Sequence, residues 1–120
     1  MDALELLLNS ERPNMPEKEI KLKRLSKACG GDVIFRLRAL SYNRVAELQK
    51  ADSDMNVHII LAGVVSPDLK SEELKKKYNA VTPAEMIKAM LLPGEIEDIS
   101  REIEKLSGYR AATVEEVKKK

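Results

Sequence analysis

The 120-residue chain is poor in the residues from which catalytic centres and aromatic-rich cores are built. It has one His, one Cys, no Trp and only 3% aromatic residues. A core must therefore come from aliphatic side chains, a composition that favours helices over a β-sandwich. The length fits a single domain, and one cysteine cannot form an internal disulfide, as is common in a reducing compartment.

The side-chain sets that catalysis and metal binding need are also missing. Nothing in the sequence brings His58 close to Cys29, and a cysteine nucleophile needs both a base and an orienting group. One His and one Cys cannot fill a structural zinc site. The acidic residues between Glu95 and Glu104 are spread around a predicted helix. We therefore expect no enzymatic activity and no cofactor.

The chain has almost no excess of charge of either sign. Its net charge is +1, from 21 basic and 20 acidic side chains. This near balance argues against a dedicated nucleic-acid binder, which usually carries a clear basic excess. The apolar stretch Leu4–Leu8 is too short for a membrane span or for the apolar part of a signal peptide. We expect a cytoplasmic protein.

Residues 1–16 are predicted to form a leucine-rich helix followed by a linker. Asp2 is a candidate N-cap, Leu4, Leu7 and Leu8 are the apolar residues, and the polar stretch that follows contains two prolines. A helix this short is marginal in water, because nucleation costs more than a few hydrogen bonds return. We expect the leucines to dock, either on the chain's own domain or on a partner.

An antiparallel β-hairpin is predicted over residues 19–38. Apolar residues alternate with charged ones from Glu19 to Leu25 and again from Val33 to Arg38, with Gly30-Gly31-Asp32 as the turn between them. One face would bury Ile20, Leu22, Val33, Phe35 and Leu37, and the other would expose Lys21, Lys23, Arg36 and Arg38.

Residues 41–107 are predicted to be helical. Ser41 and Ser71 are candidate caps, and Thr82-Pro83-Ala84-Glu85 has the pattern of a capping box. The apolar run Met55–Val65 fits a strand or a helix by periodicity. Its length, with Asp54 as a candidate cap, favours a buried helix that ends before Pro67.

The last helix is predicted to begin at Pro93 and to end near Gly108. Ile96, Ile99, Ile103 and Leu106 recur in it at steps of three and four. Residues 111–120 have little to bury and are expected to form a flexible tail. The fold class is thus α+β, mostly helical with one N-terminal antiparallel β-hairpin, in a single domain over residues 17–110.

Two kinds of surface are candidates for binding a partner. The first is apolar and suits an amphipathic helix, although core packing is an alternative explanation for these residues: Leu4, Leu7, Leu8, Leu91, Leu92, Pro93 and Ile96. The second is the basic hairpin face, for which a solvated surface, an acidic protein and nucleic acid are the alternatives. Because no exposed aromatics interleave with its basic residues, nucleic acid is the least favoured of the three.

Three ordered blocks resemble the XkdN-like family of phage tail-assembly chaperones. They are Arg38–Glu47, His58–Val65 and Tyr78–Tyr109, the last including Leu91-Leu92-Pro93-Gly94-Glu95-Ile96. The resemblance implies a non-catalytic protein that binds the tape measure protein and keeps it soluble until the tail tube assembles. It also implies a location in the bacterial host cytoplasm and absence from the mature virion.

Other partners and another function stay open at this point. The tail tube protein and a second copy of the chain are further candidate partners, and no membrane is expected. The alternative function is a regulatory or adaptor domain that binds nucleic acid or an acidic protein through the basic hairpin face.

Overall fold

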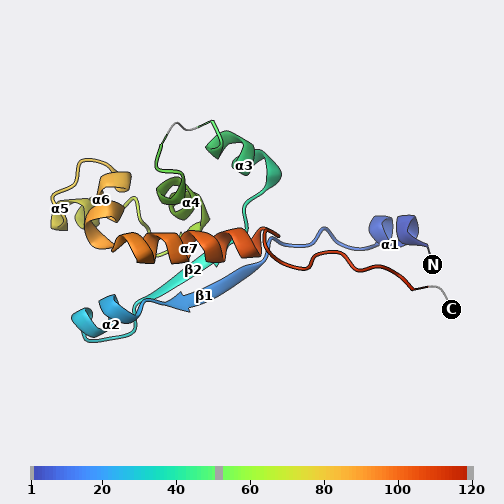
Figure 1. Ribbon diagram of the computed structural model, residues 1–120, viewed down its shortest axis with the longest axis horizontal. Coiled ribbons are helices and arrows are strands. Elements are labelled where there is room, and N and C mark those ends of the chain that lie inside the picture. The colour runs from blue at the N-terminus through green and yellow to red at the C-terminus, as the bar shows by residue number, and fades with distance from the viewer. Residues whose placement is uncertain (1, 51–52, 119–120) are drawn as a thin grey trace.

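The computed structural model describes residues 2–50 and 53–118, and over these residues the chain is elongated, with extents of 60 × 33 × 25 Å. The described residues form seven helices and a three-stranded antiparallel sheet in the order β1-β2-β3, which confirms the predicted α+β class. Helix α7 crosses one face of the sheet, and α1 and α2 lie at opposite ends of the molecule (Figure 1). The helices are α1 (Ala3–Asn9), α2 (Lys23–Cys29), α3 (Tyr42–Leu48), α4 (Met55–Gly63), α5 (Glu72–Lys77), α6 (Pro83–Met90) and α7 (Pro93–Leu106), and the strands are β1 (Glu17–Lys21), β2 (Ile34–Arg38) and β3 (Val64–Ser66).

The N-terminal strand pair is confirmed, but the turn predicted between its strands is wrong. β1 and β2 are antiparallel with Ile20 opposite Phe35, and the segment between them contains helix α2. Leu22 and Leu25 are both buried, and their spacing of three suits a helix that follows directly on the strand. Gly30 ends this helix in a left-handed conformation (φ 73°), so it acts as a helix stop and not as part of a hairpin turn.

The predicted helix over Met55–Val65 is two residues too long. Helix α4 ends at Gly63, and Val64–Ser66 continues as β3, which pairs with β2. The β-branched valines suit this strand. Ser66 is extended before Pro67, as predicted.

Most of the predicted helix caps are present, and Asp54 is the exception. The hydroxyls of Ser41, Ser71 and Thr82 each accept a hydrogen bond from the backbone N–H three residues on. Asp54 precedes α4 without capping it, because its φ is 58° and its carboxylate pairs with Lys88 at 2.6 Å. The left-handed backbone at Asp54 differs from the extended one of an ordinary N-cap, and its side chain bonds to α6 instead.

The core is mostly aliphatic, as the composition predicts, and lies where α4, α6 and α7 meet the sheet. Its fully buried side chains are Phe35, Leu37, Ile60, Met86, Ile87, Ile99, Ser100 and Ile103. Within residues 2–50 and 53–118, no buried side-chain nitrogen or oxygen lacks a hydrogen-bond partner. Ile99 and Ile103, from the predicted apolar face of α7, are in this core and pack the helix against the sheet.

Candidate functional site

Helix α1 presents its leucines to solvent. Asp2 caps the helix through a 2.9 Å bond from the N–H of Glu5, as predicted. Leu4, Leu6, Leu7 and Leu8 are 64%, 51%, 78% and 72% exposed, and no residue of α1 is buried. Figure 1 shows the helix apart from the body, joined to it by residues 10–16. Leu6 was not among the predicted binding residues, because the predicted stripe follows only one face of the helix.

The junction between α6 and α7 divides the other predicted apolar residues. Leu91 is only 4% exposed and belongs to the core, whereas Leu92 is 52% exposed. Pro93 and the half-buried Ile96 border an open depression together with Leu91 and with Met55 at the start of α4. The structure therefore does not bring the predicted junction residues together as one exposed patch.

A hydrogen-bonded cluster from α2 fixes this junction. The Arg24 guanidinium donates to the Glu95 carboxylate (Nη2 to Oε1, 2.8 Å) and to the carbonyl oxygen of Met90 (2.9 Å). The same carboxylate accepts the N–H of Leu92 at 2.7 Å, where it supports the start of α7. The hydrogen bond from Arg24 lowers the pKa of Glu95 below its ordinary value. The junction is thus held rigidly by charge-assisted bonds.

The basic hairpin face carries its own counter-charges. Lys21, Arg36 and Arg38 are exposed on the sheet as predicted, whereas Lys23 begins α2 and so lies beyond the strand. Glu17 lies 3.0 Å from Arg38 and 3.7 Å from Arg36, and Lys21 pairs with Asp32 at 3.1 Å. These pairs weaken the attraction that the face would have for phosphate groups.

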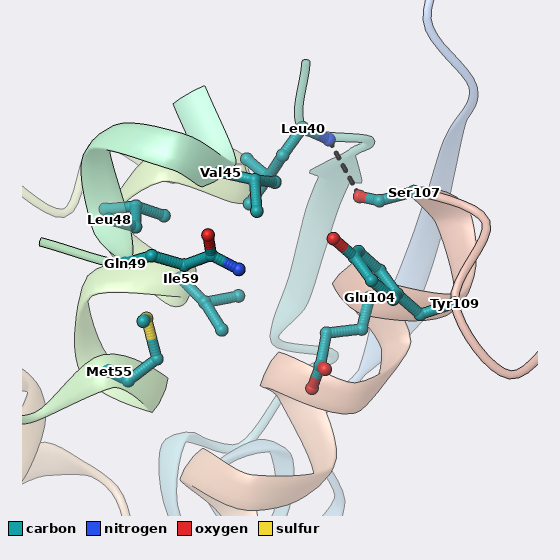
Figure 2. Close-up of a pocket in the computed structure, with 9 residues that line it drawn as sticks. All are labelled: Leu40, Val45, Leu48, Gln49, Met55, Ile59, Glu104, Ser107 and Tyr109. Atoms are coloured by element: carbon teal, nitrogen blue, oxygen red, sulfur yellow. Dashed lines mark hydrogen bonds between the residues drawn. The ribbon is translucent and has the colours of Figure 1, made fainter. Parts of the chain in front are cut away.

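A half-open apolar cavity of about 160 Å³ lies between α3, α4 and the end of α7. Figure 2 shows the side chains that surround it, with Tyr109 directed across the space towards α3. Its lining is mostly apolar and consists of Leu40, Val45, Leu48, Gln49, Met55, Ile59, Glu104, Ser107 and Tyr109. An apolar cavity of about 150 Å³ can hold benzene, so this one has room for a single leucine or aromatic side chain.

Hydrogen bonds at the end of α7 fix this part of the cavity wall. The N–H of Leu40 donates to the Ser107 hydroxyl at 2.8 Å (Figure 2). That hydroxyl in turn donates to the carbonyl of Ile103, also at 2.8 Å. Gly108 has a φ of 98° and allows the N–H of Tyr109 to reach the carbonyl of Glu104 at 3.0 Å. This helix end, predicted from Gly108, places the tyrosine at the cavity.

The cavity and the leucine helix belong to the same end of the molecule. Ala39 donates its N–H to the carbonyl of Pro16 at 2.9 Å, so the linker from α1 reaches the body beside Leu40. The C-terminal segment leaves from this end as well and runs in the direction of α1 (Figure 1). Sequence reasoning predicted the leucines but missed the cavity, because its apolar lining residues looked like ordinary core.

The described part of the chain has neither a metal-binding group nor a membrane-spanning helix. There, no three residues of the types His, Cys, Asp and Glu form a group that could hold a metal ion. None of the helices in residues 2–50 and 53–118 is long and apolar enough to cross a membrane. Cys29 is exposed at the end of α2.

Comparison with solved structures supports the fold. The crystal structure of the protein yqbn is 24% identical in sequence and superposes with a TM-score of 0.71, covering 91% of this chain and 98% of that chain. At this identity the similarity shows a shared fold. The comparison with curated proteins finds no match.

Comparison with protein families identifies the chain more directly. The family described as phage XkdN-like tail assembly chaperone protein matches residues 51–119. Two of the three blocks that carried the resemblance fall within this range, whereas Arg38–Glu47 lies before it. Because the match spans more than half of the sequence, the chain belongs to the XkdN-like family of phage tail assembly chaperones.

Proposed function

We propose that this tail assembly chaperone binds the tape measure protein and keeps it soluble in the host cytoplasm until the tail tube assembles around it. It acts by binding alone, without catalysis, and is absent from the finished virion. Membership of the family supports the general role. The surface of the chain supports the mode of binding.

The exposed leucines of α1 are the observation that carries this proposal. Burying a leucine side chain contributes about 1.5–3 kcal/mol, so Leu4, Leu7 and Leu8 together offer roughly 5–9 kcal/mol before ordering costs. A long helical client exposes an apolar stripe at similar spacing and is the kind of partner that such a helix fits. The cavity at the same end offers a pocket for one client side chain.

The α6–α7 junction is a weaker candidate surface than the sequence predicts. Leu91 is buried and cannot contact a client without disrupting the core. Leu92 and Pro93 are exposed, and they remain available for a peripheral contact. We therefore place the main contact on α1 and the cavity.

Co-expression with the tape measure protein encoded by the same phage tests the proposal. We expect the wild-type chain to raise the soluble fraction of the tape measure protein and to co-purify with it. The triple variant Leu4→Gln, Leu7→Gln and Leu8→Gln should lose both effects while keeping its fold, since these side chains support no buried contact.

Val81→Ser is the matched control, because Val81 is 81% exposed and precedes α6, away from α1 (Figure 1). It should leave both effects intact. If the wild-type chain neither solubilises nor co-purifies the tape measure protein, the proposed function is wrong. If the triple variant still works, the function stands and the binding surface is wrong.

A further inference from the structure

Strand β1 forms an uncovered edge of the sheet. The bonds Leu22 N–H to Val33 C=O (3.0 Å) and Ala39 N–H to Pro16 C=O (2.9 Å) lie at the two ends of the β1–β2 pair. Because such bonds alternate along an antiparallel pair, the even-numbered residues of β1 bond to β2. Glu17, Glu19 and Lys21 therefore direct their N–H and C=O groups outward.

These outward groups have no partner among the hydrogen bonds of the described residues. Among the residues that the structure describes, only β2 neighbours β1 in the sheet, and no other helix or strand is drawn outside this edge in Figure 1. All three residues are exposed. An edge of this kind is a template for another strand, and charged side chains are the usual protection against unwanted pairing.

The charges along this edge are complementary to those of a second copy. In an antiparallel register centred on Glu19, Glu17 of each copy lies opposite Lys21 of the other. In this register the outward N–H and C=O groups of one copy lie opposite those of its partner and can form hydrogen bonds with them. We propose that two copies of the chain pair along β1 in this register, joining their three-stranded sheets around a two-fold axis.

The face of β1 that looks towards α7 supports the same register. There Ile20 is only partly covered and lines an open hollow with Ile99 of α7. The proposed register places the aliphatic stem of Lys18 from the second copy opposite Ile20, while the ammonium of Lys18 pairs with Glu102 in its own copy. The second copy would therefore cover apolar surface that the monomer leaves open.

The dimer should be weak and dependent on concentration. Each strand has five residues, an interface below the size of stable complexes unless other contacts add to it. The register also places Glu19 opposite Glu19 of the second copy, a like-charge pair that opposes association. Replacing this residue can therefore either strengthen or abolish the pairing, and both effects can be measured.

Sedimentation velocity on the full chain, from micromolar to near-millimolar concentration, tests the proposal. Glu19→Thr removes the like-charge pair and should tighten the dimer about two- to fivefold. Glu19→Pro removes an outward N–H but no bond to β2, so it should abolish the dimer and keep the fold. Circular dichroism checks folding for each variant.

Lys21→Glu gives a second test that does not depend on proline. It places like charges opposite Glu17 of the second copy at two symmetric positions and should weaken the dimer about three- to tenfold. Because it also breaks the Lys21–Asp32 pair, Asp32→Asn is the matched control and should leave the dimer unchanged.

Two results would overturn the inference. One is a wild-type chain and a Glu19→Thr variant that stay monomeric at the highest concentration, in which case the edge charges act only as protection. The other is a dimer that survives Glu19→Pro and Lys21→Glu, which would place the interface elsewhere. The proposal does not depend on the tape measure protein, so it can fail or succeed separately from the proposed function.

Discussion

Gly63 of α4 lies so close to Ile103 of α7 that a Cβ atom on the glycine would be 2.6 Å from the Cγ2 atom of the isoleucine. Both residues are buried. The contact lets α4 approach the helix that covers the sheet, and it sets the position from which β3 leaves α4. The absence of a side chain at residue 63 is therefore part of the packing of the core.

Gly63→Ala should lower the free energy of unfolding by about 1–3 kcal/mol, because the added methyl group overpacks the contact with Ile103. Chemical denaturation of the purified variant measures this change. Gly94→Ala is the control, since nothing lies within 4 Å of its added Cβ and alanine favours the helix. It should be neutral or slightly stabilising. Equal destabilisation by both substitutions would contradict the proposed cause.

Glu95→Gln should lower the melting temperature by a few degrees, because the neutral amide lacks the negative charge that strengthens the bonds from Arg24. The amide oxygen can still accept the N–H of Leu92, so the start of α7 should form normally. Differential scanning calorimetry measures the shift. Glu97→Gln is the control, since it removes an exposed pair with Arg101 on the same helix and should change little.

Stability should fall in acid as two glutamates of α7 become protonated. Hydrogen bonds from Arg24 and from Lys18 hold the pKa values of Glu95 and Glu102 below the ordinary value of 4.5. A depressed pKa in the folded state means that the unfolded state binds more protons near and below pH 4.5. The contribution of both groups is therefore complete above that pH and is lost as the pH falls through their folded values.

Unfolding free energies measured between pH 7 and about pH 3 test this dependence. The variant Glu95→Gln should show a shallower decline than the wild-type chain, because one of the two depressed groups is gone. A double variant that also carries Glu102→Gln should be shallower still. An unchanged slope in the double variant would show that other groups cause the acid sensitivity.

Ser107→Ala should destabilise the cavity end of the chain by about 1 kcal/mol, because it leaves the N–H of Leu40 without its acceptor. Amide hydrogen exchange should show faster exchange at Leu40 in the variant. Ser10→Ala is the control, since this exposed hydroxyl only donates to a carbonyl within α1. Unchanged exchange at Leu40 would contradict the role assigned to Ser107.

Local chemistry made much of this fold predictable from sequence. Ser41 and Thr82 each cap a helix by bonding to a residue three positions on, so the cap can be recognised in a short stretch of sequence. The apolar residues of α7 recur at steps of three and four, and this spacing can also be recognised locally. Asp54 shows the limit of such reasoning. It has a capping residue type at a helix start, but its backbone is left-handed and its carboxylate pairs with Lys88, which is distant in sequence.

The candidate site was predictable to a similar degree. The leucines of α1 stand out because they occur in a short segment before a proline-containing linker. The cavity depends on how α3 and α4 meet the end of α7, a tertiary arrangement that no local pattern encodes. Leu91 and Leu92 have identical side chains, and only packing makes one buried and the other exposed.

The bond between Pro16 and Ala39 has a consequence for how α1 can act. It anchors one end of a seven-residue tether, residues 10–16, whose full extension is about 25 Å. A client segment bound by the leucines would stay within about that distance of Pro16, and so near the cavity, at an effective concentration in roughly the millimolar range. Two contacts that are weak separately would then combine into one of useful strength, while each could still release in turn.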